Sequence, residues 1–305
     1  MRVMVTGGAG FIGSHSVEAL LAAGAEVVVF DNFASGKRGN LPEDASLRVV
    51  EGDIRDRAAV ASAVRGCTHI LHLAAQVSVR ASIEDPPSSA QHNIIGFAEV
   101  LDSARHHHVE RVVFASSAAV YGDPKALPLS EESPTDPLSP YGLEKLVNEQ
   151  QAALSARLFG LSTLGLRYFN VYGPRQDPAS QYAGVISRFA DCILANQPLT
   201  VFGDGKQTRD FIFVKDVAQV NLAALRGASN GFCNIGTGHS TSLLELIDTL
   251  AGCVGHPAQS VFEAALPGDI RHSAMTPARM REWFGATPPT PLATGLRVLL
   301  GLARS

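Results

Sequence analysis

The sequence predicts an α/β protein, in which a doubly wound parallel sheet is followed by a smaller C-terminal α/β lobe. The first observation is a series of apolar, β-rich runs, "RVMVT", "EVVVF", "HILHLA", "RVVFAS" and "LSTLGLRYF". The second is that helix-patterned stretches separate these runs, at 14–24, 57–65, 88–107 and 140–159. Strands that are apolar on both faces and alternate with helices are typical of a parallel sheet covered on both sides.

The regular alternation ends after Phe169, where the Gly/Pro/Asp-rich connection "NVYGPRQDP" begins. The apolar run "DFIFV" at 210–214 and the helix-like stretch 216–226 indicate a return to the first lobe. We therefore predict two discontinuous domains. The first comprises residues 1–169 and about 210–229, and the second about 170–209 and 230–305.

Composition limits the possible partners. The chain has 305 residues, 46% hydrophobic and 18% charged, with a net charge of -4. Nucleic-acid-binding proteins usually carry a basic patch, so we expect no nucleic-acid partner. The C-terminal run "GLRVLLGLA" is too short to span a bilayer, and we expect no membrane association.

The four cysteines, Cys67, Cys192, Cys233 and Cys253, lack the close pairing of zinc sites and disulfide frameworks. We interpret them as small core residues in a reducing compartment and predict no metal site. At the N-terminus, glycines interrupt the apolar run too early for a secretory signal. A cytoplasmic location is the expectation.

A glycine-rich turn follows the first strand. In "VMVTGGAGFIGS", Gly7, Gly10 and Gly13 lie directly after a strand and at the start of a helix. Such glycines let the backbone approach a pyrophosphate, whose charge is favoured at a helix N-terminus. Any tight strand-to-helix turn favours glycine, but the flanking elements here match a Rossmann dinucleotide site.

Asp31 indicates which dinucleotide binds. It follows the second strand, 18 residues after Gly13, where a carboxylate can accept hydrogen bonds from the adenosine ribose. A 2′-phosphate would be repelled there, which favours NAD over NADP. Two alternatives remain at this point: Asp31 could simply open the turn "DNFASG", and Lys37 and Arg38 leave room for NADP.

A tyrosine and a lysine provide candidate chemistry. In "SPYGLEKL", Tyr141 and Lys145 are four apart and share one face of a helix that Ser139 can cap and Pro140 can begin. A nearby ammonium and a nicotinamide cation favour the phenolate, which makes Tyr141 a candidate base for a sugar or alcohol hydroxyl. The same spacing occurs by chance on many amphipathic helices, and the upstream glycine loop is what favours the catalytic interpretation.

These motifs resemble the extended short-chain dehydrogenase/reductase family and, within it, nucleotide-sugar epimerases of the UDP-hexose 4-epimerase type. The resemblance covers essentially the whole chain. The residues that carry it are "TGGAGFIG" (6–13), "DN" (31–32), "GDIRD" (52–56), "LAAQ" (73–76), "SSAAVYG" (116–122), "YGLEK" (141–145), "RYFNVYGPRQDP" (167–178), "TRDFIFV" (208–214) and "PGDIRHS" (267–273).

The resemblance implies an NAD site, a UDP-sugar site and three catalytic residues. The residues implied to bind NAD are Gly7, Gly10, Phe11, Ile12, Gly13, Asp31, Asn32, Ser35, Gly36, Asp53, Ile54, Leu73, Ala74, Ala75, Gln76, Asn93, Tyr141, Lys145 and Tyr168. Those implied to bind the nucleotide sugar are Ser117, Asn170, Val185, Phe202, Arg209, Asp269, Arg271 and Ser273. The implied catalytic set is Ser117, Tyr141 and Lys145.

The implied activity is that of an isomerase, which interconverts UDP-glucose and UDP-galactose through a 4-keto sugar. Tyr141 takes the proton of the 4-hydroxyl, Ser117 hydrogen-bonds that hydroxyl, and Lys145 holds the nicotinamide ribose. Ser273 occupies a family position that is bulky in enzymes restricted to plain hexoses. Its small side chain predicts that UDP-GlcNAc and UDP-GalNAc are accepted too.

One position departs from the family pattern. Many relatives have an arginine three residues before the Asp of the "PGD" turn, where this chain has Leu266. We expect Arg271 to replace the missing cation beside the diphosphate, because an anionic ligand gains most from charge-assisted hydrogen bonds. Arg209 is expected to pair with the diphosphate, although an ion pair with Asp210 is the alternative.

Related dehydratases and decarboxylases need an additional acid or base, which the family pattern supplies where this chain has Ala118 and Ala119. An alanine cannot transfer protons, so epimerisation is favoured. UDP-glucuronate 4-epimerase remains the principal alternative, with Arg175, Arg188 or Arg271 as the carboxylate ligand. Other NAD-dependent nucleotide-sugar enzymes and a non-catalytic NAD-binding sensor are further alternatives. By the family's pattern, the stretches 88–107 and 140–159 also predict a homodimer.

Overall fold

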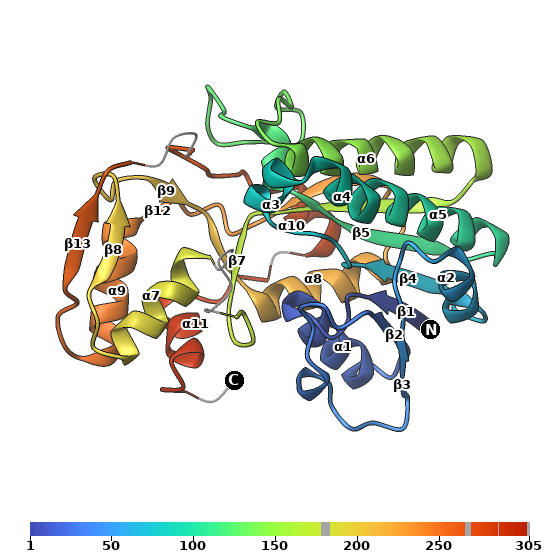
Figure 1. Cartoon of the computed structure of the whole chain (residues 1–305), viewed down its shortest axis with the longest axis horizontal. Helices are drawn as coiled ribbons and strands as arrows, with labels where there is room; N and C mark the ends of the chain where they lie inside the picture. The colour runs from blue at the N-terminus through green and yellow to red at the C-terminus, as the bar shows by residue number, and fades with distance from the viewer. Residues whose placement is uncertain (178–183, 266–269, 286, 304–305) are drawn as a thin grey trace.

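A seven-stranded parallel sheet organises the first lobe, in a computed structural model that describes residues 1–177, 184–265, 270–285 and 287–303 (Figure 1). In spatial order its strands are β11 (Gly231–Ile235), β6 (Ser162–Tyr168), β5 (Arg111–Ser117), β4 (His69–His72), β1 (Arg2–Thr6), β2 (Glu26–Asp31) and β3 (Leu47–Glu51). The strand order reverses between β1 and β4, where ligands of doubly wound sheets bind. The predicted Rossmann-type sheet is thereby confirmed.

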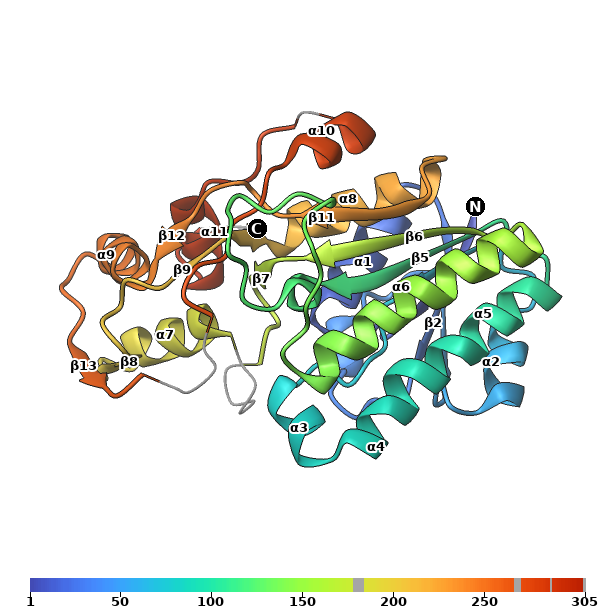
Figure 2. The same cartoon turned by 90° about the horizontal axis from the view of Figure 1, so that it is seen from above.

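Alternating side chains give the sheet an apolar layer on each face. Val3 and Val5 of β1 pack on one side with α1 (Phe11–Ala22) and α8 (Val214–Arg226). Met4, between them, packs on the other side, which α2 (Arg57–Val64), α5 (Gly96–His106) and α6 (Pro140–Phe159) cover. Figure 2 shows α5 and α6 side by side on that second face. This layering explains why the strands are apolar at consecutive positions.

The second lobe has its own apolar core, formed by Ile186, Phe189, Leu199, Leu246 and Leu296 among others. Its elements lie at the left of Figure 1. They are β7 (Asn170–Tyr172), α7 (Val185–Leu194), β8 (Leu199–Phe202), β9 (Thr208–Arg209), β10 (Phe211–Phe213), β12 (Thr241–Ser242), α9 (Leu243–Val254), β13 (Ser260–Glu263) and α11 (Leu292–Leu299). The strands pair two by two: β7 with β10, β8 with β13 and β9 with β12.

Two C-terminal elements return to the first lobe. Strand β11 pairs with β6, so the main sheet extends beyond the range 210–229 given in the predicted division. Helix α10 (Ala278–Phe284) packs its Met280 into the core that α1 and α8 share. The run "GFCNI" begins with glycine and has a polar Asn234 next to its end, which leaves little apolar pattern to identify it as a sheet strand.

Short helices connect β4 to α5. They are α3 (Val79–Glu84), α4 (Pro86–Ala90) and a π-helical turn, η2 (Gln91–Ile95), all packed on α6. The stretch 88–107, expected as one helix, is thus α4, η2 and α5 in succession. Two 3-10 turns, η1 (Arg38–Asn40) and η3 (Ala118–Tyr121), follow β2 and β5. Within the described ranges, every helix is too short or too polar to cross a membrane.

Candidate active site

The glycine loop after β1 brings the start of α1 close to the sheet. Gly7 has a φ of +67°, and a Cβ there would lie 2.7 Å from the backbone nitrogen of Ala74. A Cβ on Gly13 would lie 2.1 Å from the carbonyl oxygen of Gly7. Both positions therefore require glycine, the first for its backbone conformation and for space, the second for space.

The first turn of α1 fits a pyrophosphate. Gly10 is its N-cap and offers no side-chain cap, and the turn contains no acidic residue. Four amide N–H groups at a helix N-terminus lack intrahelical partners, and they favour an anion. The residue types and the close-packed loop thus suit the diphosphate of a dinucleotide.

Asp31, at the end of β2, is buried beside this loop. Its Oδ2 accepts a hydrogen bond from the Ala9 amide at 2.9 Å, and its Oδ1 accepts one from the Phe33 amide at 2.8 Å. Two further acceptor sites remain on the carboxylate for ribose hydroxyls. Ser35 and Gly36 follow in the same loop, and a Cβ on Gly36 would lie 3.0 Å from Asp31 Oδ1.

The two cations that left room for NADP are engaged elsewhere. Lys37 pairs with Asp177 at 3.3 Å, and Arg38 pairs with Glu51 at 2.7 Å. Neither ion pair involves Asp31. The structure therefore gives the NADP alternative no support from these side chains.

The residues expected at the adenine adjoin one another at the end of the loop. Asn32 Nδ2 donates to Asp53 Oδ2 at 3.1 Å. Arg55 also donates to Asp53, and these hydrogen bonds hold the pKa of the Asp53 carboxyl well below its usual range. Ile54 is buried under Gly96, where a Cβ would meet its Cδ1 at 2.6 Å.

Residues 73–76 form a turn that is held from both ends. Thr6 Oγ1 accepts hydrogen bonds from the Leu73 and Ala74 amides, each at 3.2 Å, and lies 2.8 Å from His72 Nδ1. Burial lowers the pKa of His72 to about 3, so its ring is neutral at physiological pH. At the other end, the Gln76 amide donates to Asn93 Oδ1 at 2.9 Å.

Asn93 was expected to face the cofactor, but its side-chain amide is already used. Its Nδ2 donates to the Gln76 carbonyl oxygen at 2.8 Å and to Glu144 Oε2 at 2.6 Å. Asn93 is 1% exposed, so these bonds define its position. The side chain holds the 73–76 turn in place.

Tyr141 and Lys145 lie in the first turns of α6, as their spacing predicted. Ser139 caps the helix by accepting from the Gly142 amide at 3.1 Å, and Pro140 is its first residue. Lys145 Nζ donates to the Ala115 carbonyl oxygen at 3.0 Å and lies 5.7 Å from the centroid of the Tyr141 ring. Helix capping therefore places the phenol and the ammonium beside the carboxyl end of β5.

Burial changes the acid-base properties of this pair. It raises the pKa of Tyr141, while a hydrogen bond with the Ser117 side chain acts in the opposite direction. Burial lowers the pKa of Lys145 to about 8, and the Glu144 carboxylate opposes that effect. Ser117, Tyr141 and Lys145 thus form one cluster in the structure.

The motif "SSAAVYG" turns the chain away from β5 and lies directly against α6. Ser117 Oγ accepts a hydrogen bond from the Ala119 amide at 3.1 Å, which starts η3. A Cβ on Gly142 would lie 2.7 Å from the Ala119 carbonyl oxygen. The contact requires a small residue on α6 and fixes Ser117 relative to Tyr141.

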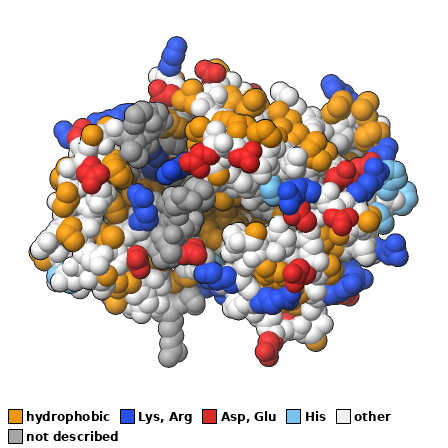
Figure 3. All heavy atoms as spheres, in the orientation of Figure 1, with side chains coloured by type: hydrophobic (Ala, Val, Ile, Leu, Met, Phe, Trp, Pro, Cys, Tyr) orange, Lys and Arg blue, Asp and Glu red, His pale blue; other side chains and the backbone are white. Residues whose placement is uncertain are grey.

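The substrate residues expected in the second lobe lie on several elements. Asn170 begins β7, Val185 begins α7 and Phe202 ends β8. The Ser273 amide donates to the Thr208 carbonyl oxygen at 3.1 Å, and Arg209 Nη1 donates to the same oxygen at 2.9 Å. Figure 3 shows a hollow between the two lobes. The two hydrogen bonds to the Thr208 carbonyl oxygen place Ser273 and the Arg209 guanidinium beside β9.

Several other predicted residues have specific outcomes. Arg271 donates two hydrogen bonds of 2.7 Å to Asp204, instead of standing free for a diphosphate.

The Asp210 carboxylate accepts hydrogen bonds from Thr237 and from the Gly238 amide. The ion pair considered between Asp210 and Arg209 is not among these contacts. Asp269 lies outside the described residues, as does Leu266. The Tyr168 hydroxyl donates to Asn221 Oδ1 at 2.6 Å, which ties it to α8.

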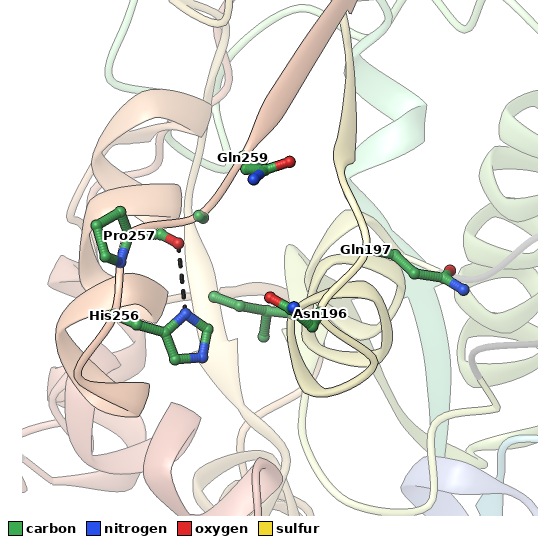
Figure 4. A pocket seen from close by; sticks show the side chains of 7 residues that line it. Asn196, Gln197, His256, Pro257 and Gln259 are labelled. Atoms are coloured by element: carbon green, nitrogen blue, oxygen red, sulfur yellow. Dashed lines mark hydrogen bonds between the residues drawn. The ribbon is translucent and has the colours of Figure 1, made fainter.

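A separate small hollow lies in the second lobe (Figure 4). It is lined by Ile193, Asn196, Gln197, His256, Pro257, Ala258 and Gln259 at the ends of α7 and α9. His256 Nδ1 lies 3.3 Å from the Pro257 carbonyl oxygen. None of the predicted site residues lines it, and we assign it no role in the reaction.

Sequence reasoning missed three buried polar residues beside the cluster: Thr6, His72 and Glu144. Thr6 and His72 end their strands within apolar runs, where a polar side chain can indicate a hydrogen-bonding role. Glu144 lies within "YGLEK", on the same side of α6 as Tyr141 and Lys145 in the structure. An acidic residue three positions from the tyrosine was the available signal.

Comparison with known proteins gives consistent matches over the whole chain. Residues 3–236 match the model of the NAD dependent epimerase/dehydratase family. A relative named UDP-glucose 4-epimerase, from Mycolicibacterium smegmatis, is 40% identical over 302 residues, which are 97% of this chain and 96% of the relative.

Three solved structures share the fold. A UDP-N-acetylglucosamine 4-epimerase from Methanobrevibacter ruminantium has a TM-score of 0.95 at 34% identity, over 99% of this chain and 97% of its own. A UDP-glucose 4-epimerase from Thermotoga maritima gives 0.94 at 36%, over 99% and 98%. A UDP-glucuronic acid 4-epimerase from Bacillus cereus, solved with NAD, gives 0.91 at 31%, over 99% and 98%.

The sheet order, the glycine loop and the Ser117–Tyr141–Lys145 cluster agree with these matches. The resemblance inferred from the motifs is confirmed, and NAD is the cofactor of the family. The chain belongs to the NAD-dependent epimerase/dehydratase family, within the extended short-chain dehydrogenases/reductases.

Proposed function

We propose that this protein is a UDP-sugar 4-epimerase, which interconverts UDP-glucose with UDP-galactose and UDP-GlcNAc with UDP-GalNAc. The observation that carries the proposal is the buried cluster of Ser117, Tyr141 and Lys145, with two alanines, Ala118 and Ala119, directly after Ser117. The family provides NAD-dependent epimerases, and its members act on three kinds of UDP-sugar. The substrate must therefore be argued from this chain's own residues.

The residues divide the proton chemistry among them. NAD, when bound, supplies the group that accepts hydride from C4 of the sugar and returns it. Tyr141 takes the proton of the 4-hydroxyl and gives it back after the 4-keto sugar has rotated to present its other face. Ser117, hydrogen-bonded to Tyr141, orients that hydroxyl, and Lys145 keeps a positive charge beside the phenol.

Residues 118 and 119 limit the reaction to this cycle. Elimination of water or carbon dioxide from a keto sugar needs an additional acid or base near the ring. Ala118 and Ala119 have no titratable group. Hydride removal and return are the steps that the remaining side chains support.

The hexose substrates are favoured over a uronic acid by the state of two arginines. Arg175 pairs with Glu18, and Arg271 pairs with Asp204. A carboxylate at C6 of the sugar would have to displace one of these acidic partners or use another cation. Arg188, the third arginine considered for that carboxylate, lies exposed on α7. The preference for neutral hexoses therefore rests on Arg175 and Arg271.

Product analysis tests the proposal. The protein is incubated with NAD and, separately, with UDP-glucose, UDP-GlcNAc and UDP-glucuronate, and the products are resolved by chromatography. We expect 4-epimers from the first two and unchanged UDP-glucuronate. Interconversion of UDP-glucuronate alone would support the glucuronate alternative. NAD binding without product and without absorbance from NADH would favour the non-catalytic sensor.

The predicted role of Ser273 can be tested through the range of sugars that the protein accepts. The variant Ser273→Tyr should lose turnover of UDP-GlcNAc by about tenfold or more, because a bulky ring would fill the space for the acetamido group. Turnover of UDP-glucose should change much less. Equal losses on both substrates would contradict the proposed role of this residue.

A further inference from the structure

A carboxylate that the proposed reaction does not use lies inside the site. Glu144 is on α6, three residues after Tyr141 and directly before Lys145, and it is 3% exposed. Its Oε2 accepts hydrogen bonds from Ser89 Oγ at 2.9 Å and from Asn93 Nδ2 at 2.6 Å. A buried carboxylate is costly unless it is paired or hydrogen-bonded, so these contacts are what make its position tolerable.

The hydrogen bonds continue beyond Asn93 into the cofactor site. Asn93 binds both the amide and the carbonyl oxygen of Gln76, at 2.9 and 2.8 Å. Gln76 ends the 73–76 turn, whose Ala74 lies against Gly7 of the glycine loop. A continuous set of contacts therefore runs from Glu144 to the loop that fits the pyrophosphate.

The backbone around Asn93 supports a specific role for this link. Asn93 is the central residue of the π-helical turn η2, between α4 and α5. Single π-turns within helices are rare and are frequent at functional sites. In this turn Asn93 makes its three hydrogen bonds to Gln76 and Glu144, so the irregular backbone coincides with the link itself.

We propose that Glu144 is a positioning residue, which acts through Asn93 to hold the 73–76 turn beside the glycine loop and so shapes the NAD site. This inference rests on the proposed placement of these residues around NAD. Glu144 does not need to touch the substrate or the cofactor. Its contribution is to fix the orientation of the Asn93 amide.

Four variants separate the hydrogen bond from general packing. Glu144→Gln keeps an acceptor oxygen, whereas Glu144→Leu has a similar volume and no acceptor. Glu144→Asp keeps the carboxylate but is one methylene too short to reach Asn93. Ser89→Ala is the matched control, because it removes the other hydrogen bond to the same carboxylate and leaves the Asn93 link intact.

The readout is the dissociation constant for NAD, measured by calorimetry on protein freed of nucleotide. We expect Glu144→Leu and Glu144→Asp to bind NAD about tenfold more weakly, because a lost acceptor leaves the buried Asn93 amide unpaired. We expect Glu144→Gln and Ser89→Ala to remain within about twofold of the unmutated protein, on the same scale. Glu144→Asp keeps the comparison available if Glu144→Leu does not fold.

A double-mutant cycle tests whether Glu144 acts through Asn93. If it does, adding Glu144→Leu to Asn93→Ala should cause little further loss of NAD affinity, because the two changes interrupt the same link. Additive losses would overturn the inference. So would equal losses in Glu144→Leu and Ser89→Ala, or weak binding by Glu144→Gln.

The outcome also distinguishes this inference from the proposed function. An unmutated protein that does not bind NAD would refute the proposed site itself. An unmutated protein that binds NAD, together with a folded Glu144→Leu variant that binds it equally well, would refute only the role of Glu144. Circular dichroism at each stage shows whether the variants are folded.

Discussion

Tyr141 depends on its surroundings for any activity as a base. Burial raises its pKa, and the Ser117 hydrogen bond acts against that effect. Lys145 lies close enough to add a favourable positive charge, although burial brings its own pKa to about 8. Tyr141 can therefore act as a base only with the Ser117 hydroxyl and the Lys145 ammonium beside it.

The variant Tyr141→Phe tests that requirement. It should reduce kcat by about 10²- to 10⁴-fold, the range contributed by a positioned acid or base. The matched control is Tyr172→Phe, a buried tyrosine in the core of the second lobe. We expect the control to retain most of its activity in a chromatographic assay. Similar losses in both variants would argue against a specific role for the Tyr141 hydroxyl.

His72 makes the folded protein sensitive to acid. Its pKa falls from 6.5 to about 3 because the ring is buried, so the folded state does not bind the proton that the unfolded state takes up. Above about pH 6.5, His72 is neutral in both states and does not lower the free energy of unfolding. As the pH falls from 6.5 towards 3, the unfolded state gains a proton at His72 and the folded state does not, so the free energy of unfolding falls. Thr6 satisfies the neutral ring, which matches this requirement.

The variant His72→Asn should remove that acid sensitivity. Between neutral pH and about pH 4.5 the unmutated protein should lose about 2 to 3 kcal/mol more stability than the variant, since each pKa unit is about 1.4 kcal/mol. Urea unfolding at both pH values measures the difference. The exposed residue His106 provides the control, and His106→Asn should behave like the unmutated protein.

At the scale of elements, a buried ion pair joins the strands and the helix of the active site. Arg167 on β6 donates twice to Glu149 on α6, at 2.7 Å each, and Glu149 also accepts from Ser116 at 2.6 Å. Arg167 Nη1 donates to the Tyr121 hydroxyl at 2.7 Å. These contacts connect β5, β6, η3 and α6, the elements that hold Ser117, Tyr141 and Lys145.

Removing one partner of this pair should be costly. Arg167→Leu leaves the Glu149 carboxylate buried without its cation, and we expect a loss of about 3 to 5 kcal/mol in the free energy of unfolding. Arg38→Leu is the matched control, because its ion pair with Glu51 is exposed and should be worth less than about 1 kcal/mol. A small effect of Arg167→Leu would mean that β5, β6, η3 and α6 are held together mainly by apolar packing.

The sequence predicts the regular elements better than the irregular ones. Helix α6 begins at Pro140 and ends at Phe159, as the pattern of 140–159 indicated, because Ser139, Pro140 and Gly160 are strong boundary signals. The π-turn at Gln91–Ile95 has no such signal, since its residues continue the helical pattern. The partners of Asn93 and Glu144 depend on that turn, and they were therefore outside the reach of pattern analysis.

The candidate site divides in the same way. The glycines, Asp31, Tyr141 and Lys145 are recognisable because each has a fixed place relative to a strand or a helix start. The pairing of Arg271 with Asp204 joins residues 67 positions apart, and no local pattern indicates it. Contacts between residues far apart in the sequence, such as this pair and the Asn93–Glu144 hydrogen bond, are what required the structure.

At the scale of the whole molecule, apolar side chains remain exposed on α6 and on the turn next to it. On α6 they include Leu143, Leu154, Leu158 and Phe159, and Ile95 lies on the adjoining η2. Figure 2 shows α5 and α6 running together at this surface. We propose that two copies of the chain pair through these helices as a homodimer.

Sedimentation velocity tests the homodimer. The unmutated protein should sediment as a dimer, and Leu154→Glu with Leu158→Glu should give a monomer, because two carboxylates would be buried without partners. Leu194→Glu is the matched control, since Leu194 is 58% exposed on α7 in the other lobe. It should remain dimeric. A monomeric unmutated protein would contradict the proposal.

The return of β11 and α10 to the first lobe has a consequence for how the chain can be divided. Neither lobe corresponds to one continuous piece of the polypeptide. A chain that stopped after Ile235 would contain every strand of the main sheet, yet the apolar surface that Met280 covers would face water. We therefore expect such a fragment to aggregate on expression.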